Sequence, residues 1–262
     1  MLMFSLENVD PLLDALYILS RCAENTIIQC SPSMVSIIVL HHELDLNVSF
    51  QMMPQFFSHF ASNKTHSSKT LIQPLYNTLK RMKESQITSF SFFLLPPLDH
   101  LVLKFYSPRN ESPLIRKFGK VNAAKENLRN IDFETFVSID SLQFRRIIKK
   151  CRDYFVSVTP RHSDVKFSNE VRDFIFPKEK DEKWVLIKLV WLADVMMLQG
   201  AGECIAEGKT EFLIPTYPFH VFNNIGFQSK RVWLFKSVDK LGTFIIAPVG
   251  LFAQFAIYYP VP

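Results

Sequence analysis

The sequence predicts an α+β fold of two similar domains, each made of two β–α–β–β–β units. Three observations lead to this prediction. The hydrophobic period changes from two residues to about 3.6 at several places, which marks a strand that leads into a helix. Short apolar or alternating runs typical of strands follow each change. The chain has 262 residues, 48% of them hydrophobic, which is enough for two ordinary domains with their own cores.

The first unit begins with an alternating run at residues 1–6 and a helix predicted over 11–21. Leu12, Leu16 and Leu19 recur at helical spacing and form one face of that helix. Three strand-like runs follow, at 26–30, 34–41 and 45–52.

The second unit begins near residue 69 and contains a helix predicted over 73–85. Leu75, Leu79 and Met82 form its apolar face. Its polar face carries three basic residues, Lys80, Arg81 and Lys83. Two strand-like runs follow, at 88–95 and 100–106.

The third unit, which opens near Asp132, shows the clearest change of period. Apolar residues alternate up to Ile139, then recur at three- and four-residue steps through Phe144, Ile147 and Cys151, as in an amphipathic helix. The opposite face of this helix is strongly basic, with five cations in eight residues: Arg145, Arg146, Lys149, Lys150 and Arg152. Strands are predicted at 155–158, 165–168 and 184–191.

The fourth unit contains an aromatic helix at 217–227, preceded by a short run at 210–215. We interpret Phe219, Phe222 and Phe227 on this helix as core residues rather than as a platform for stacking bases. Three strand-like runs complete the unit, at 232–236, 242–247 and 254–259.

The best candidate for an interdomain linker is the basic, weakly periodic stretch 107–130, which contains Pro108, Pro113 and Gly119. We therefore predict one domain over 1–125, including the start of the linker, and a second over 126–262.

Composition narrows the class of protein. The formal net charge is +5 and the pI about 8.9, which suits a polyanionic partner without proving one. The four cysteines are far apart, as expected for reduced thiols in an intracellular protein. No apolar stretch is long enough to span a membrane, and the first residues do not resemble a signal peptide. We expect an intracellular protein with no membrane partner.

The sequence shows no recognisable catalytic, cofactor or metal motif. His41 and His42 cannot both reach one ion from a strand, because adjacent side chains point to opposite faces. Gly-rich phosphate loops and nucleophile motifs are absent from the sequence. We expect a protein that is not an enzyme, with no cofactor and no metal, although a catalytic site assembled only in three dimensions stays open.

The basic helix face has two interpretations at this level. In the first, the cluster is simply the solvated face of the helix, where Lys and Arg commonly lie, and it needs no binding partner. Five cations offset only by Asp153 also suit a polyanion.

The order of these elements resembles the DNA sliding-clamp superfamily, which includes proliferating cell nuclear antigen and the subunits of the nine-one-one checkpoint clamp. The passage FVSIDSLQFRRIIKKCRDYFVSV (136–158) followed by DVKFS (164–168) is similar to the start of a clamp's second domain. LGTFIIAPVGLFAQFAIYYPVP (241–262) is similar to a clamp's last two strands. LYILSRCAENTIIQC (16–30) and VSFQMMPQFF (48–57) resemble the checkpoint subunit that carries the regulatory tail. The basic charge also favours a checkpoint subunit, since replicative homotrimeric clamps are acidic.

The resemblance implies a DNA-clamp fold with helices on an inner face and antiparallel sheets outside. It implies a non-catalytic subunit that encircles duplex DNA and recruits repair, checkpoint or replication proteins. The alternatives are a replicative homotrimeric clamp and a polymerase processivity factor that acts as a monomer or dimer. The implied DNA contacts are the basic residues of the two amphipathic helices: Arg145, Arg146, Lys149, Lys150, Arg152, Lys80, Arg81 and Lys83.

The resemblance also implies partners and a location. These are double-stranded DNA, other clamp subunits in a homo- or heterotrimer, a clamp loader, and client proteins with short hydrophobic motifs. The expected location is the nucleus. Strands near 100–106 and 232–247 would be the edges that pair with neighbouring subunits.

Overall fold

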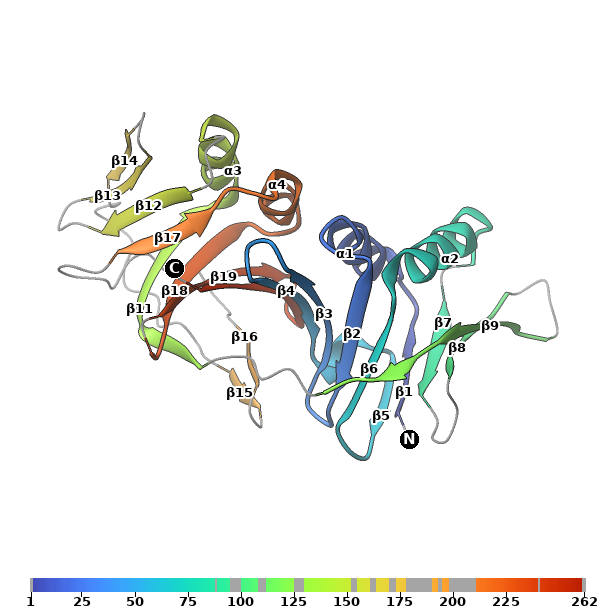
Figure 1. The fold of residues 1–262 in the computed structure, drawn as a ribbon. Helices are drawn as coiled ribbons and strands as arrows, with labels where there is room; N and C mark the ends of the chain where they lie inside the picture. The colour runs from blue at the N-terminus through green and yellow to red at the C-terminus, as the bar shows by residue number, and fades with distance from the viewer. Residues whose placement is uncertain are drawn as a thin grey trace. The chain divides into compact units, whose positions relative to one another are not determined.

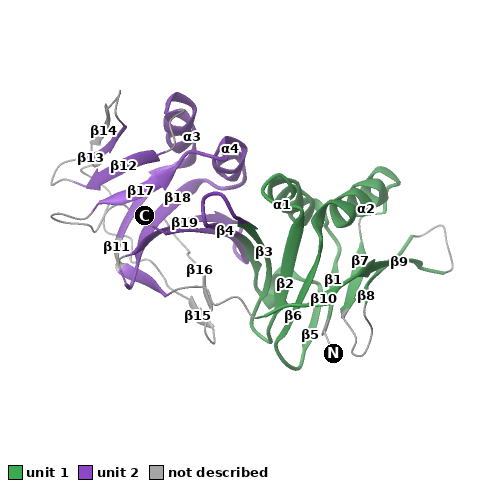
Figure 2. Cartoon of the chain, in the orientation of Figure 1, with its two compact units in different colours: residues 1–40, 49–127, 192–195 green, residues 41–48, 128–191, 196–262 purple. Residues whose placement is uncertain are grey.

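The chain divides into two compact parts, named unit 1 and unit 2, each of which has the size of a predicted domain and not of a single β–α–β–β–β unit (Figure 2). Unit 1 comprises residues 1–40, 49–127 and 192–195, and unit 2 comprises residues 41–48, 128–191 and 196–262. The computed structural model describes residues 2–87, 89–94, 100–107, 112–124, 130–151, 155–160, 164–169, 173–177, 190–192, 195–197, 211–239 and 241–260. Helices and antiparallel strands occur in both units, which confirms the predicted α+β class. The expected domain boundary at 125/126 falls outside the described residues.

The described residues of the first part of the chain, up to 124, form two α-helices, one 3₁₀ helix and ten strands. Figure 1 shows their arrangement. In chain order these are β1 (Leu2–Leu6), α1 (Asp10–Ser20), β2 (Asn25–Cys30), β3 (Val35–His41), β4 (Leu46–Met52), the 3₁₀ helix η1 (Pro54–Phe56), β5 (His59–Ser62), β6 (His66–Leu71), α2 (Ile72–Glu84), β7 (Phe90–Leu94), β8 (His100–Phe105), β9 (Leu114–Gly119) and β10 (Val121–Asn122).

These strands follow two matching orders, β5-β1-β7-β8-β9 and β10-β6-β2-β3-β4. If each of β1–β5 is replaced by the strand five places later, and each of β6–β10 by the strand five places earlier, one order becomes the other. The region therefore contains two β–α–β–β–β repeats, and the first strand of each repeat joins the sheet formed by the other repeat's later strands.

Helices α1 and α2 bury the apolar faces that the sequence predicts. Leu16 and Leu19 of α1 are fully buried, as is Leu79 of α2 at 1% exposure. The two helices pack side by side over the sheets of unit 1 (Figure 1). Tyr17 and Tyr76 contact each other between them, with ring centroids 5.9 Å apart.

The second part of the chain repeats this plan. Its elements are β11 (Ile131–Asp140), α3 (Ser141–Lys150), β12 (Phe155–Pro160), β13 (Asp164–Ser168), β14 (Asp173–Pro177), β15 (Val190–Leu192), β16 (Val195–Met197), β17 (Phe212–Pro215), α4 (Phe219–Gln228), β18 (Arg231–Ser237), β19 (Gly242–Val249) and β20 (Ala253–Pro260).

Unit 2 has the same exchange of strands between repeats. Its strand orders are β14-β13-β12-β17 and β20-β19-β18-β11. Exchanging β11, β12, β13 and β14 with β17, β18, β19 and β20, respectively, converts one order into the other. Aromatic side chains fill one part of the core, where Phe136, Trp233, Phe235 and Phe244 are at most 3% exposed. Phe136 pairs with Phe235 across β11 and β18, and Phe235 pairs with Phe244 across β18 and β19.

The candidate linker 107–130 contains two strands, since β9 pairs with β8 and β10 pairs with β6. Thr70 Oγ1 also donates to the Gly119 carbonyl at 2.9 Å. The weak periodicity of the stretch concealed these strands. The division between the two units falls within this stretch, after residue 127.

The prediction of the edge strands is wrong, because the expected strands lie inside their sheets. Strand β8 lies between β7 and β9, while β18 and β19 pair with neighbours on both sides. Among the described residues, β9 and β14 end their respective sheets. An apolar run with strong strand propensity favours the middle of a sheet, where both faces and both edges are covered.

Candidate nucleic-acid interface

The candidate interface is built on α3, whose start is fixed by a side-chain cap. Asp140 Oδ1 accepts hydrogen bonds from the backbone N–H groups of Leu142 at 2.9 Å and Gln143 at 3.2 Å. Such a cap satisfies donors that the first helical turn leaves unpaired. Phe144 and Ile148 are fully buried, so the opposite side of α3 faces outward.

The outward face of α3 is cationic. Arg146, Lys149 and Lys150 are exposed. Among the described residues, neither Arg146 nor Lys149 forms an ion pair with a carboxylate. Residues 141–150 and 219–228, the two helices of unit 2, contain no Asp or Glu at all. Lys and Arg side chains presented in this way can contact phosphates, and no carboxylate on either helix competes for them.

Arg145 is placed differently from its neighbour Arg146. It is half-buried, and its guanidinium carbon lies 3.2 Å from the ring centroid of Phe227 on α4. The stem crosses Gly226, where an added Cβ would come within 2.6 Å of Arg145 Cγ. Its Nε is buried without a hydrogen-bond partner among the described residues. Arg145 therefore joins α3 to α4 instead of projecting outward.

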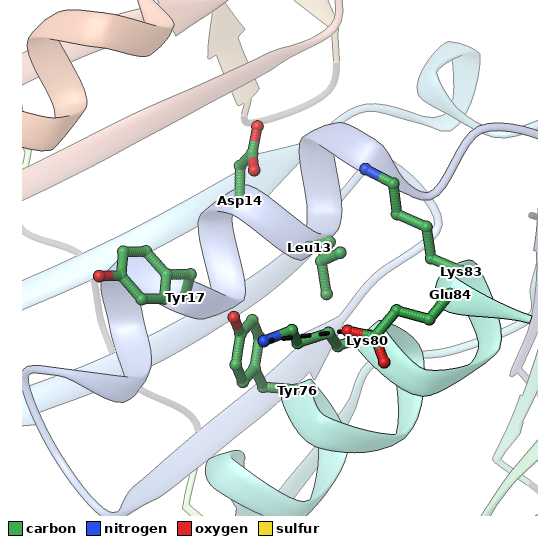
Figure 3. A pocket seen from close by; sticks show the side chains of 7 residues that line it. All are labelled: Leu13, Asp14, Tyr17, Tyr76, Lys80, Lys83 and Glu84. Carbon is green, nitrogen blue, oxygen red and sulfur yellow. Dashed lines mark ion pairs between the residues drawn. The ribbon is translucent and has the colours of Figure 1, made fainter.

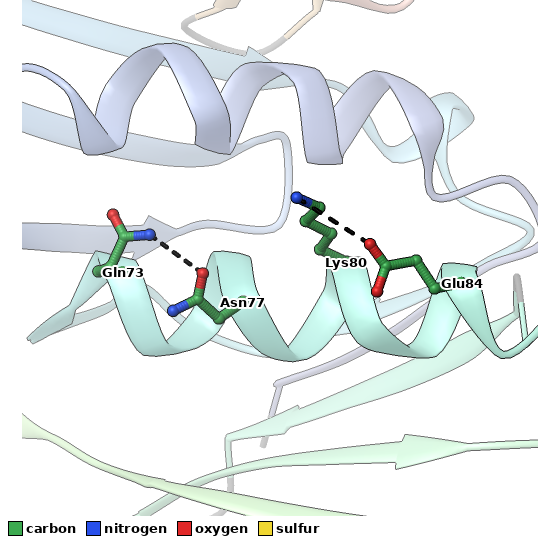
Figure 4. A network of polar contacts seen from close by, with 4 residues as sticks. All are labelled: Gln73, Asn77, Lys80 and Glu84. Atoms are coloured by element: carbon green, nitrogen blue, oxygen red, sulfur yellow. Dashed lines mark hydrogen bonds and ion pairs between the residues drawn. The ribbon is translucent and has the colours of Figure 1, made fainter.

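The basic residues of α2 are exposed, and two of them lie near carboxylates. Lys83 Nζ is 2.8 Å from Asp10 Oδ1 at the start of α1, and this hydrogen bond raises the pKa of Lys83 above its ordinary value. Lys80 Nζ is 4.0 Å from Glu84 Oε1, one turn along the same helix (Figure 4). Arg81 is exposed and forms no ion pair with a carboxylate among the described residues.

An open groove of about 510 Å³ runs between α1 and α2 (Figure 3). Tyr17 and Tyr76 lie at one end of the groove, and Lys83 lies toward the other. Its lining combines both signs of charge on an aromatic and aliphatic base: Leu13, Asp14, Tyr17, Tyr76, Lys80, Lys83 and Glu84. This mixed lining gives the groove no strong preference for an anion.

The structure brings the predicted residues together in two groups. Arg145, Arg146, Lys149 and Lys150 share α3, whereas Lys80, Arg81 and Lys83 share α2. Arg152, the eighth predicted residue, lies outside the described residues.

The aromatic helix α4 departs from the expectation that its phenylalanines are core. Phe222 is fully buried, but Phe219 is 41% exposed and Phe227 is 61% exposed. At about 100° per residue, Phe227 lies about 140° around the helix from Phe222, outside the buried arc of Val221, Phe222 and Ile225. The spacing could have identified Phe227 as outward-facing, but the high aromatic content obscured it.

Other kinds of site find no support in the part of the chain that the structure describes. No three His, Cys, Asp or Glu side chains there gather as a metal site would require. No helix within the described ranges is long and apolar enough to cross a bilayer. Burial raises the pKa of the Cys22 thiol to about 12, so this cysteine is a poor nucleophile.

Neither a scan against protein-family models nor a search of curated proteins finds a match to this chain.

Proposed function

We propose that this chain is a non-catalytic subunit of a DNA sliding clamp, nearest to the checkpoint type, that encircles duplex DNA in the nucleus. One observation carries the proposal: each unit pairs two β–α–β–β–β repeats, and α3 in the second unit exposes a cationic face. The same order of elements and the same basic helix underlie the resemblance of the sequence to sliding clamps.

Electrostatics make the α3 face suitable for duplex DNA. Each Lys or Arg placed near a phosphate releases condensed counterions, which favours binding to any DNA sequence. Contacts to phosphates alone carry no sequence information, so a protein that relies on them can move along the duplex. Arg146 and Lys149 are the principal contacts in this proposal, with Lys150 beside them.

A ring requires subunits to join through exposed sheet edges. Strand β9 ends the β5-β1-β7-β8-β9 sheet, and β14 ends the β14-β13-β12-β17 sheet. An edge strand offers unpaired backbone N–H and C=O groups to another chain. We therefore assign subunit pairing to β9 and β14, with two further subunits, identical or different, completing a trimer. A clamp loader and clients with short hydrophobic motifs are the remaining proposed partners.

The deciding experiment compares retention on closed circular and linear DNA after mixing the chain with its candidate partner subunits and loader. A clamp that encircles DNA stays on a closed circle but slides off a linear molecule at its free ends. Native mass spectrometry of the same sample should give a trimer. Equal retention on both DNAs by a monomer or dimer would favour a processivity factor that does not encircle DNA, and would overturn the proposal.

A further inference from the structure

Phe227 is the feature of α4 that the proposed function leaves unexplained. The residue is 61% exposed on a helix whose other central aromatic residue, Phe222, is fully buried. Exposing most of an aromatic ring to water forgoes the stabilisation that burial gives. The ring is nevertheless held in a defined place, because the Arg145 guanidinium lies over it at 3.2 Å from the centroid.

The packing of Arg145 depends on a position that lacks a side chain. A Cβ at residue 226 would lie 2.6 Å from Cγ and 2.8 Å from Cδ of Arg145, distances that force the arginine to move. Gly226 thus allows the stem of Arg145 to cross α4 and to place its guanidinium over the neighbouring ring. Arg145 is therefore a positioning residue for Phe227.

The helix that supplies Arg145 to Phe227 carries further cations. Arg146 and Lys149 follow Arg145 by one and four positions on α3 and are exposed. An exposed aromatic ring backed by an arginine, on whose helix two further cations are exposed, matches the parts of a nucleotide, since the ring suits the base and the cations suit the phosphates. An apolar protein partner would instead have to remove water from the same cations without pairing them.

We propose that the α3–α4 face binds an unpaired nucleotide of DNA, whose base stacks on Phe227 while adjacent phosphates contact Arg146 and Lys149. The inference deepens the proposed function and rests on it for the DNA partner. The base must be unpaired, because a base within the duplex is covered above and below by its neighbours and offers only its edges. The site would favour junctions, bulges and gaps over continuous duplex.

The test uses the full chain and three DNA probes of equal length: a perfect duplex, the same duplex with one extra unpaired thymidine, and the same duplex with an abasic residue in that place. We expect the thymidine probe to bind about tenfold more tightly than the abasic probe, within the range that base–aromatic stacking gives. Fluorescence anisotropy measures each affinity.

Phe227→Leu should abolish this preference, because leucine keeps an apolar side chain but has no ring face. Phe219→Leu is the matched control on the same helix and should keep the preference. The double variant R146Q/K149Q should weaken all three probes alike. Thermal melting and circular dichroism verify that each variant is folded.

The outcomes separate the two proposals. Binding to every probe with no difference between thymidine and abasic DNA overturns the stacking site and leaves the clamp proposal intact. Binding to the thymidine probe alone supports the stacking site and counts against the duplex clamp. Failure of the wild-type chain to bind any probe overturns the stacking site, whereas the clamp proposal is overturned only by the retention experiment with partner subunits and loader. Loss of subunit assembly in F227L, with the DNA preference unchanged, would assign the ring to a protein contact and overturn the stacking site.

Discussion

The helix pair α1–α2 and the helix pair α3–α4 occupy equivalent places in two units of the same topology, yet they present different surfaces. Carboxylates accompany the cations of the first pair, where Asp10 bonds Lys83 and Glu84 lies near Lys80. The helices of the second pair carry no carboxylate within 141–150 or 219–228. A shared arrangement of elements therefore leaves the surface charge free to diverge, and only the second surface is strongly cationic.

The joints between the helices differ in the same way. In unit 1 an ion pair and two tyrosines connect α1 with α2. In unit 2 an arginine stacked on a phenylalanine connects α3 with α4. Lys83 in the first pair is thus held by an anion, whereas Arg145 in the second is held by a ring that remains exposed.

The largest expected effect tests what the two pairs share. Ile147→Asp in α3 and Leu79→Asp in α2 each place a carboxylate where the wild-type side chain is at most 2% exposed. Each should lower the free energy of unfolding by about 3–5 kcal/mol, because a buried unpaired charge is strongly unfavourable. Urea denaturation measures the loss, with Lys149→Asp and Lys80→Asp as exposed controls. Similar losses in buried and exposed variants would refute the helix orientation.

The second prediction tests the difference in charge. The double variant R146Q/K149Q should make the plot of log duplex affinity against log salt concentration less steep. Its slope should change by about 0.9 for each phosphate contact that is lost. K80Q/K83Q should change it less, since these lysines already lie near carboxylates. Affinities measured over a series of salt concentrations decide between the pairs. A larger effect from K80Q/K83Q would move the DNA contact to unit 1.

The third prediction separates two adjacent arginines. Arg145→Met keeps the stem over Gly226 but removes the guanidinium from Phe227, and should lower the free energy of unfolding by about 1 kcal/mol. Arg146→Met should leave stability unchanged and weaken duplex binding. Denaturation and salt titration are run on both variants. If the two behave alike, Arg145 is an ordinary surface residue.

The smallest effect is expected at the joint of unit 1. Asp10→Asn removes the anion from Lys83, so the pKa of Lys83 should fall toward its ordinary value and its ammonium group should become available to phosphates. We expect a slightly steeper salt dependence of duplex binding and a small fall in the melting temperature. K83Q in the same background is the control, and it should reverse the steeper salt dependence.

The helices were predictable from the sequence because their apolar spacing does not depend on the rest of the fold. Leu12, Leu16 and Leu19 mark α1, and Phe144 with Ile147 marks α3, and all five side chains are buried as expected. Strand β9 was not predictable in the same way. Its residues are mostly exposed, so no alternation marks it, and only its pairing with β8 makes it a strand.

The candidate site was predictable as a face but not in its details. Helical spacing places Arg145 and Arg146 on the polar side of α3, and the sequence treats them alike. Their difference comes from Gly226 and Phe227, which lie about 80 residues further along the chain and meet α3 only in the folded unit. A one-dimensional pattern cannot report such a neighbour.

The exchange of strands between repeats has a consequence for the folding of a single repeat. A lone repeat such as residues 2–62 contributes to two sheets, since β1 belongs to one and β2 to the other. Each of these sheets lacks strands that the other repeat supplies. Expressed alone, that fragment should self-associate, because a second copy of it can supply the strands of the missing repeat.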